Sequence, residues 1–176
     1  MVITLTGFMG CGKSSVGRIL AERLGWKFTD LDEYIVHKKG MSITDIFATE
    51  GEEYFRALEA ECVRDVVVMS RITGEDTVLA LGGGTLTYRA VRWLVLGQTE
   101  SVRLKASLST CLSRIGDCTS SRPLLEAGKS EEDINGLFEA RESVYALAKH
   151  TVDNDTGSAS EAADRVIAAV FGKTHQ

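Results

Sequence analysis

The chain has 176 residues and a formal net charge of −5, with 44% apolar and 26% charged residues. This length suits one globular domain that buries a real hydrophobic core, so we expect a single domain over residues 1–176. The acidic balance argues against a broad surface for nucleic acid or an anionic membrane, and any anion site must therefore be local.

The cysteines favour a reducing compartment, and the apolar segments predict neither a signal peptide nor a membrane span. None of the four cysteines forms a C-x-x-C pair, which argues against a zinc site, and their spacing suggests no disulfide framework. The apolar residues 1–6 lack a basic region and run directly into a glycine motif, so they predict a strand rather than a signal peptide. No apolar run approaches the ~18 residues of a membrane span. We expect a cytoplasmic monomer with no membrane or nucleic-acid partner.

Short apolar runs separated by helical patterns predict an alternating α/β chain. Strands that alternate with helices favour right-handed crossovers and a parallel sheet covered on both faces. Ligands of such sheets bind beyond the carboxyl ends of the strands, which points to the loops after Thr6, Asp30 and Leu81. The predicted strands cover residues 2–6, 26–30, 77–81, 100–105 and 151–153. Helices are predicted from near Lys13, after Ser42, around 55–66, around 134–145 and over about 160–170.

The first of these loops carries a phosphate-binding motif. Residues 7–14 match G-x-x-x-x-G-K-[ST], in which glycines let backbone N–H groups point at phosphate oxygens. The following helix adds the positive end of its dipole. We expect Lys13 to reach the β- and γ-phosphates and the Ser14 hydroxyl to ligate Mg²⁺. The expected nucleotide-binding residues of this loop are Gly10, Cys11, Gly12, Lys13, Ser14 and Ser15.

The motif alone does not select a function, because GTPases, motor ATPases and kinases share it. The guanine-reading N-K-x-D tetrapeptide is absent, and the chain is shorter than most ATP-driven machines. Small-molecule and nucleotide kinases remain, together with a nucleotide-binding module that has lost catalysis.

Two aspartates follow the second predicted strand. Asp30 and Asp32 lie on the same side if the strand persists, although one of them could simply cap a helix beginning near Glu33. Many P-loop proteins hold Mg²⁺ with an acid at the end of a strand beside the first, but the best candidate strand here ends in three glycines. We therefore expect Asp30 to support the metal and Asp32 to accept the proton of a substrate hydroxyl.

Three consecutive glycines, residues 82–84, end the third predicted strand. A turn seldom needs three, so we interpret them as a close approach of backbone to ligand, with a tight turn into a helix near Arg89 as the alternative.

Four arginines are candidates for binding anionic groups. Arg56 and Arg141 lie on predicted helices, where the alternative is a solvated arginine paired with a glutamate at i,i+4. Arg122 follows a small, polar segment, and a mobile loop that bears an arginine can deliver charge to a transferring phosphoryl group. For Arg114 we weigh stacking on a nucleotide base against a solvated surface arginine.

The combination of these motifs resembles the shikimate kinase family over nearly the whole chain. The resemblance implies a three-layer α/β sandwich with a five-stranded parallel sheet, of the P-loop nucleoside-monophosphate-kinase-like type. It also implies a transferase that uses MgATP to phosphorylate the 3-hydroxyl of shikimate in aromatic amino acid biosynthesis. The matching segments are residues 7–14, 28–32, 55–56, 81–84 and 122–125, together with Arg141 and Tyr145.

The resemblance also assigns roles by matching position. Ser14 and Asp30 would support Mg²⁺, Arg114 would lie beside adenine, and Arg122 would act from a lid over about residues 112–126. Residues 154–157 lack the arginine that some members place beside adenine, so that contact stays unassigned. Reasoning from the residues alone leaves a gluconate-like acid or a nucleotide as alternative substrates. The implied shikimate-binding residues are Asp32, Arg56, Gly82, Gly83, Gly84 and Arg141.

Overall fold

A five-stranded parallel sheet forms the centre of the computed structural model, which describes residues 1–116 and 130–172. The strand order is β2-β3-β1-β4-β5, so the first strand lies in the middle of the sheet. The five predicted strands are confirmed, with ends that differ from the prediction by at most one residue. They are β1 (Val2–Thr6), β2 (Lys27–Asp30), β3 (Thr77–Ala80), β4 (Glu100–Lys105) and β5 (His150–Asp153).

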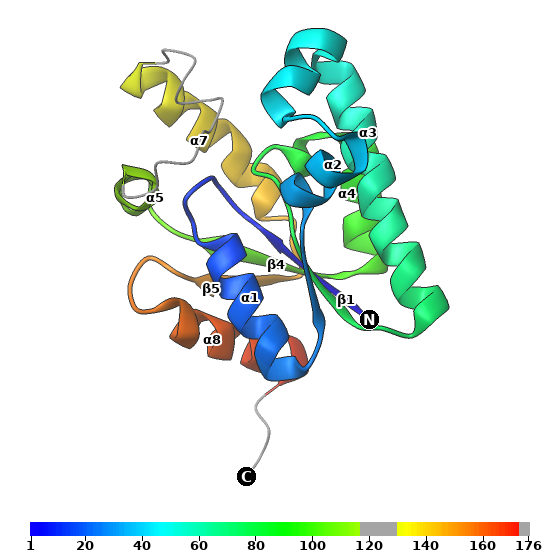
Figure 1. Cartoon of the computed structure of the whole chain (residues 1–176). Coiled ribbons are helices and arrows are strands. Elements are labelled where there is room, and N and C mark those ends of the chain that lie inside the picture. The colour runs from blue at the N-terminus through cyan, green and yellow to red at the C-terminus, as the bar shows by residue number, and fades with distance from the viewer. Residues whose placement is uncertain (117–129, 173–176) are drawn as a thin grey trace.

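Helices connect the strands and cover both faces of the sheet, as predicted (Figure 1). The helix predicted after Ser42 and the one predicted around residues 55–66 belong to a single run, which is interrupted at Gly51 by a φ of 83°. The helices are α1 (Lys13–Leu24), α2 (Leu31–Lys39), α3 (Ile43–Thr73), α4 (Arg89–Gln98), α5 (Leu108–Gly116), α7 (Glu131–Tyr145) and α8 (Ala159–Phe171), with a 3₁₀ turn η1 (Thr85–Thr87). None of these helices combines the length and apolarity needed to cross a membrane.

The sheet divides the interior into two hydrophobic cores. Successive residues of a strand point to opposite faces, so Ile3 packs in the core beneath α1 and α8, while Val2 packs in the core beneath α3 and α4. Figure 1 shows α1 beside α8 on one side of the sheet and α3 with α4 on the other. Every residue of β1 is buried, as expected for a central parallel strand covered on both faces.

A glycine allows α1 to pack closely on the sheet. A Cβ atom at Gly17 would lie 2.5 Å from Cε2 of Phe28 and 3.3 Å from Cδ1 of Leu5. The Phe28 ring is also covered by the Arg18 guanidinium, 4.8 Å from the ring centroid, which limits where the ring can move. The position of α1, and of the phosphate loop at its start, therefore depends on the absence of a side chain at residue 17.

The space around two helical glycines predicts opposite effects of their substitution by alanine. Gly17→Ala should lower the free energy of unfolding by about 1–3 kcal/mol, because the new methyl group overpacks the contact with Phe28. Gly136→Ala, at an exposed position of helix α7 with open space around it, should raise it by up to about 1 kcal/mol, because alanine is the better helix former. Urea denaturation of both variants measures the two changes. A stabilised Gly17→Ala protein would contradict the proposed packing.

Candidate active site

The phosphate loop has a backbone that requires its glycines. Gly7, Gly10 and Gly12 have φ values of 143°, 77° and 99°, which side chains rarely adopt. A Cβ atom at Gly10 would also lie 2.3 Å from the carbonyl oxygen of Cys111. Conformation and space thus both exclude side chains here, and the loop can wrap closely around an anion at the start of α1.

The Lys13 side chain folds back onto the loop. Its Nζ atom donates to the carbonyl oxygens of Gly7 and Phe8, at 2.9 Å each. These contacts hold the ammonium group against the loop backbone. Ser15 is exposed on the first turn of α1. The six loop residues predicted to bind nucleotide therefore lie together, and Lys13 carries the positive charge among them.

Ser14 and Asp30 meet across the gap between α1 and β2. The Ser14 hydroxyl donates to Oδ2 of Asp30 at 2.6 Å, while Oδ1 of Asp30 accepts from the backbone N–H of Asp32 at 3.1 Å. Asp30 is thus the N-cap of α2, which begins at Leu31 rather than near Glu33 as predicted. One carboxylate therefore caps the helix, which confirms the alternative weighed for this residue, and also reaches the phosphate loop.

This pair has the chemistry that Mg²⁺ prefers. Hydroxyl and carboxylate oxygens are hard donors, and Mg²⁺ commonly takes only one or two such protein groups together with phosphate oxygens and waters. Within residues 1–116 and 130–172, no group of three or more histidine, cysteine or acidic side chains could hold a metal ion by itself. The residues present therefore fit an ion that arrives with a nucleotide.

The three glycines after β3 each face a different element. A Cβ atom at Gly82 would lie 3.1 Å from Oδ1 of Asp32, and one at Gly84 would lie 2.7 Å from Nη2 of Arg56. The corresponding point at Gly83 is 3.7 Å from Nη1 of Arg141 and 3.5 Å from the backbone nitrogen of Met9. The glycine segment thus allows Asp32, Arg56, Arg141 and the phosphate loop to gather around one piece of backbone.

Arg56 is held by a buried acid that sequence reasoning missed. Nη1 of Arg56 donates to Oε2 of Glu59 at 2.6 Å, and the Thr85 hydroxyl donates to Oε1 of Glu59 at 2.6 Å. Glu59 is 1% exposed, and burial raises the pKa of its carboxyl above the usual range although the Arg56 guanidinium opposes the shift. A weaker contact joins Nη2 of Arg56 to Glu52 at 3.3 Å. The i,i+4 pair of the alternative is therefore present, but Arg56 is an oriented, largely buried cation rather than a solvated one.

Arg141 is a second buried guanidinium at this edge of the sheet. The residue is 9% exposed, and its Nη1 atom has no hydrogen-bond partner in the part of the chain that the structure describes. Nearby on α7, the Tyr145 hydroxyl donates to the carbonyl oxygen of Gly83, and Glu142 forms an ion pair with Arg103 on β4. These contacts fix the end of α7 against the sheet, so the unpaired N–H of Arg141 has a defined position.

Arg114 lies beside the phosphate loop. Its Nη1 atom is 3.5 Å from the carbonyl oxygen of Cys11. Asn154, which follows β5, donates from Nδ2 to the same oxygen at 2.8 Å. Arg122 and most of the predicted lid segment lie outside the described residues. Sequence reasoning gave Asn154 no role, since a single asparagine in a loop carries no recognisable spacing.

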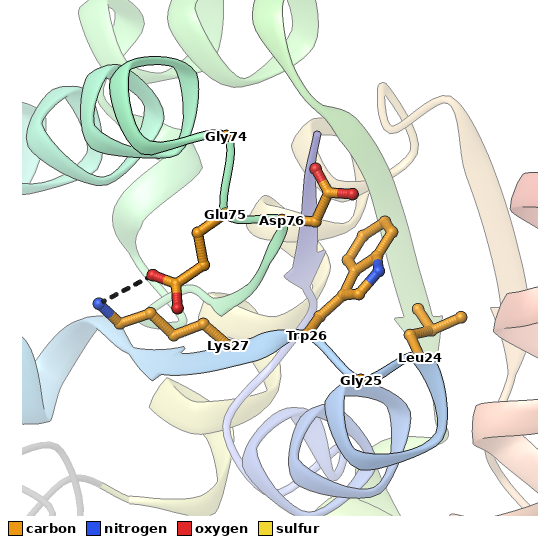
Figure 2. Close-up of a pocket in the computed structure, with 7 residues that line it drawn as sticks. All are labelled: Leu24, Gly25, Trp26, Lys27, Gly74, Glu75 and Asp76. Carbon is orange, nitrogen blue, oxygen red and sulfur yellow. Dashed lines mark ion pairs between the residues drawn. The ribbon is translucent and has the colours of Figure 1, made fainter.

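A separate hollow lies at the opposite end of the sheet. Figure 2 shows it between the loops at the amino ends of β2 and β3. Lys27 forms a 3.7 Å ion pair with Glu75 there, and Trp26 also lines the hollow. Ligands of parallel sheets bind beyond the carboxyl ends of the strands. The residues described above all gather at that carboxyl edge, and we assign the candidate site there.

The assembled groups have complementary chemistry. An anion cradle with Lys13 lies beside the carboxylate of Asp32, which can accept a proton, and beside two buried guanidinium groups, which favour planar anions. Such a site is suited to phosphoryl transfer onto the hydroxyl group of a small acid.

Comparisons with known proteins agree with this chemistry. The shikimate kinase family model matches residues 9–171. A shikimate kinase of Geobacter sulfurreducens is 41% identical over 175 residues, which cover 99% of this chain and 92% of that protein. One from Thermus thermophilus is 43% identical over 166 residues, covering 94% and 87% respectively.

Solved structures place the fold in the same group. The structure of shikimate kinase from Acinetobacter baumannii in complex with shikimate superposes with a TM-score of 0.88 at 31% identity, covering 99% of this chain and 95% of that one. A sugar kinase from Janibacter has a TM-score of 0.67 at 12% identity, which shows the shared fold alone. With a family model that spans most of the chain and relatives above 40% identity over nearly its full length, the chain belongs to the shikimate kinase family.

Proposed function

We propose that this chain transfers the γ-phosphoryl group of ATP to the 3-hydroxyl of shikimate, a step in the biosynthesis of chorismate and the aromatic amino acids. The observation that carries the proposal is the convergence of Asp32, Arg56 and Arg141 on the glycine segment 82–84, directly beside the phosphate loop. Membership of the shikimate kinase family supports the same substrate.

The two arginines account for the carboxylate of the substrate. Arg56 is held by Glu59, and the end of α7 that carries Arg141 is fixed by the contact of Tyr145 with Gly83, so both guanidinium groups are oriented before a ligand arrives. Arg141 also keeps an N–H without a partner among the described residues. Guanidinium groups bind carboxylates through charge-assisted, often bidentate hydrogen bonds. Gly82, Gly83 and Gly84 would border the bound ring, because side chains at these positions would occupy the space between the arginines and the loop.

Proton transfer and charge stabilisation fall to separate residues. Asp32 would orient the hydroxyl group and accept its proton, and Lys13 would stabilise the charge on the transferring phosphoryl group. Ser14 and Asp30 would hold Mg²⁺, which neutralises phosphate charge when bound. Arg114 would contact the nucleotide, and Arg122 would add charge from the lid. The remaining loop residues Gly10, Cys11, Gly12 and Ser15 would supply backbone and hydroxyl donors to the phosphates.

A coupled assay of ADP release tests the proposal directly. Shikimate should support turnover in the presence of MgATP, and gluconate and the nucleoside monophosphates should not. Phosphorus NMR of the product would identify the phosphorylated hydroxyl. Turnover with gluconate or a nucleoside monophosphate in place of shikimate would reject the assignment.

Loss of Lys13 should remove catalysis. Lys13→Ala should reduce kcat to the background of the assay, because no other loop residue supplies a positive charge to the transferring group. Lys27→Ala is a matched control, since Lys27 lies at the amino end of β2, far from the candidate site, in an exposed ion pair with Glu75. A Lys13→Ala protein that retained the wild-type kcat would exclude the phosphate-loop mechanism.

Asp32 should matter for rate and little for stability. Asp32→Asn should lower kcat by about 10²–10⁴, the usual contribution of a general base. Because Asp30 is the residue that caps α2, the thermal midpoint should change little. Glu33→Gln, at the next position of the same helical turn, should keep normal turnover. An unchanged kcat in Asp32→Asn would assign the proton transfer to another group.

Removal of either buried guanidinium should weaken shikimate binding specifically. Loss of one member of a desolvated charge pair costs about 2–5 kcal/mol, so Arg56→Ala or Arg141→Ala should raise the shikimate Kd by about 30-fold to more than 1000-fold. The Kd of a non-hydrolysable MgATP analogue should change little, and lysine should rescue only in part. Arg64→Ala, exposed on α3, serves as control. Titration calorimetry separates the two ligands, and equal weakening of both would indicate a purely structural role.

A further inference from the structure

Asn154 connects the end of the sheet to the phosphate loop. Its backbone N–H donates to the carbonyl oxygen of Lys105 at 2.7 Å, which continues the pairing of β5 with β4 by one residue. The side chain turns inward, so that the residue is 3% exposed, and Nδ2 donates to the carbonyl oxygen of Cys11 at 2.8 Å. A residue that is 143 positions away in the sequence therefore holds one peptide group of the loop.

The identity of the donor atom follows from the surroundings. Oδ1 of Asn154 is buried and has no hydrogen-bond partner among the residues that the structure describes. With the amide reversed, Oδ1 would face the Cys11 carbonyl and two acceptors would oppose each other. The contact is therefore specific for a donor, and a carboxylate of the same shape cannot replace it.

The tethered carbonyl fixes the direction of an N–H group. In a trans peptide the C=O and the N–H point in opposite directions, and the structure has no cis peptide bond among its described residues. When Asn154 holds the Cys11 carbonyl on the outer side of the loop, the N–H of Gly12 must point to the inner side. Gly12 is the N-cap of α1 and has a φ of 99°, so neither a helical hydrogen bond nor a preferred conformation holds this peptide. Arg114 also contacts the Cys11 carbonyl oxygen, but at 3.5 Å, so the 2.8 Å hydrogen bond from Asn154 is the shorter of the two.

We propose that Asn154 is a positioning residue that keeps the Gly12 N–H directed at the phosphate groups of the bound nucleotide. This inference rests on the nucleotide-binding part of the proposed function. Asn154 acts through the backbone and does not contact the nucleotide itself. A rotated peptide would present the Cys11 carbonyl oxygen to the phosphate, replacing a donor with a repelling acceptor.

Two neighbouring contacts support this role. A Cβ atom at Gly12 would lie 2.8 Å from Nδ2 of Asn154, so the asparagine fills the space that this glycine leaves open. The next residue, Asp155, accepts from the backbone N–H of Ser107 at 2.8 Å, at the start of the helix that carries Arg114. Consecutive side chains of one loop thus hold the phosphate loop and α5 in a common frame.

Two substitutions test the assignment in the intact chain. Asn154→Ala removes the donor, and Asn154→Asp removes it while keeping the shape and adding a negative charge near the phosphates. One lost hydrogen bond to a charged group corresponds to about a 10- to 100-fold rise in Kd, so we expect this rise for MgADP in Asn154→Ala and at least as large a rise in Asn154→Asp. The shikimate Kd, measured without nucleotide, should stay within about twofold of the wild-type value.

Titration calorimetry with MgADP and with shikimate gives both dissociation constants. Asn135→Ala, on the exposed face of α7, is the control, because it makes the same chemical change outside the site. An MgADP Kd within twofold of wild type in both Asn154 variants would overturn the proposal. Equal weakening of MgADP and shikimate would also overturn it, since that result indicates general disruption. The MgADP constants keep their meaning even if shikimate is not phosphorylated, so failure of the proposed function remains distinguishable.

Discussion

The parallel register of β1, β2 and β3 is the constraint on which the site depends. Leu5 pairs with Ala80, and Ala80 pairs with Asp30, so the three strands end at the same level. Because parallel strands share their direction, the phosphate loop, the aspartates and the glycine segment emerge at one edge. A slip of one residue in any strand would turn its side chains to the opposite face and disperse these groups. The hydrophobic cores on both faces of the sheet resist such a slip.

The site concentrates positive charge in an acidic protein. Arg56, Arg141 and Arg103 are largely buried at the carboxyl edge, although the chain as a whole carries a net charge of −5. Burial of a charge is costly unless a partner compensates, and Glu59 and Glu142 are the partners that Arg56 and Arg103 receive. Arg141 keeps an N–H without a partner among the described residues, so a ligand carboxylate would complete its hydrogen bonding. The positive charge of the site is thus local, and it suits the binding of a small anion.

Several residues of the site act on other site residues rather than on a substrate. Glu59 orients Arg56, Tyr145 holds Gly83, and Asn154 holds the carbonyl of Cys11. Tyr145 and Asn154 reach these groups from segments far along the chain, whereas Glu59 lies one turn from Arg56 on α3 and itself accepts a hydrogen bond from Thr85. The glycine backbone and the phosphate loop are therefore held by side chains from other elements. Precise placement of reacting groups is worth several kcal/mol in rate, and supporting contacts of this kind maintain it.

The sequence by itself determined the element order, the five strands to within one residue, and the residues with recognisable chemistry. Those features are local, because hydrophobic periodicity and glycine spacing act over short stretches of chain. Only the tertiary structure decided that Asp30 caps α2 while reaching Ser14, that Glu59 lies buried against Arg56, and that Asn154 meets the phosphate loop. A glutamate in a helix or an asparagine after a strand has no distinctive pattern in the sequence. The Arg56–Glu59 pair is local to α3, but the contact of Glu59 with Thr85 and that of Asn154 with Cys11 arise from packing between segments that are distant along the chain, which no local pattern encodes.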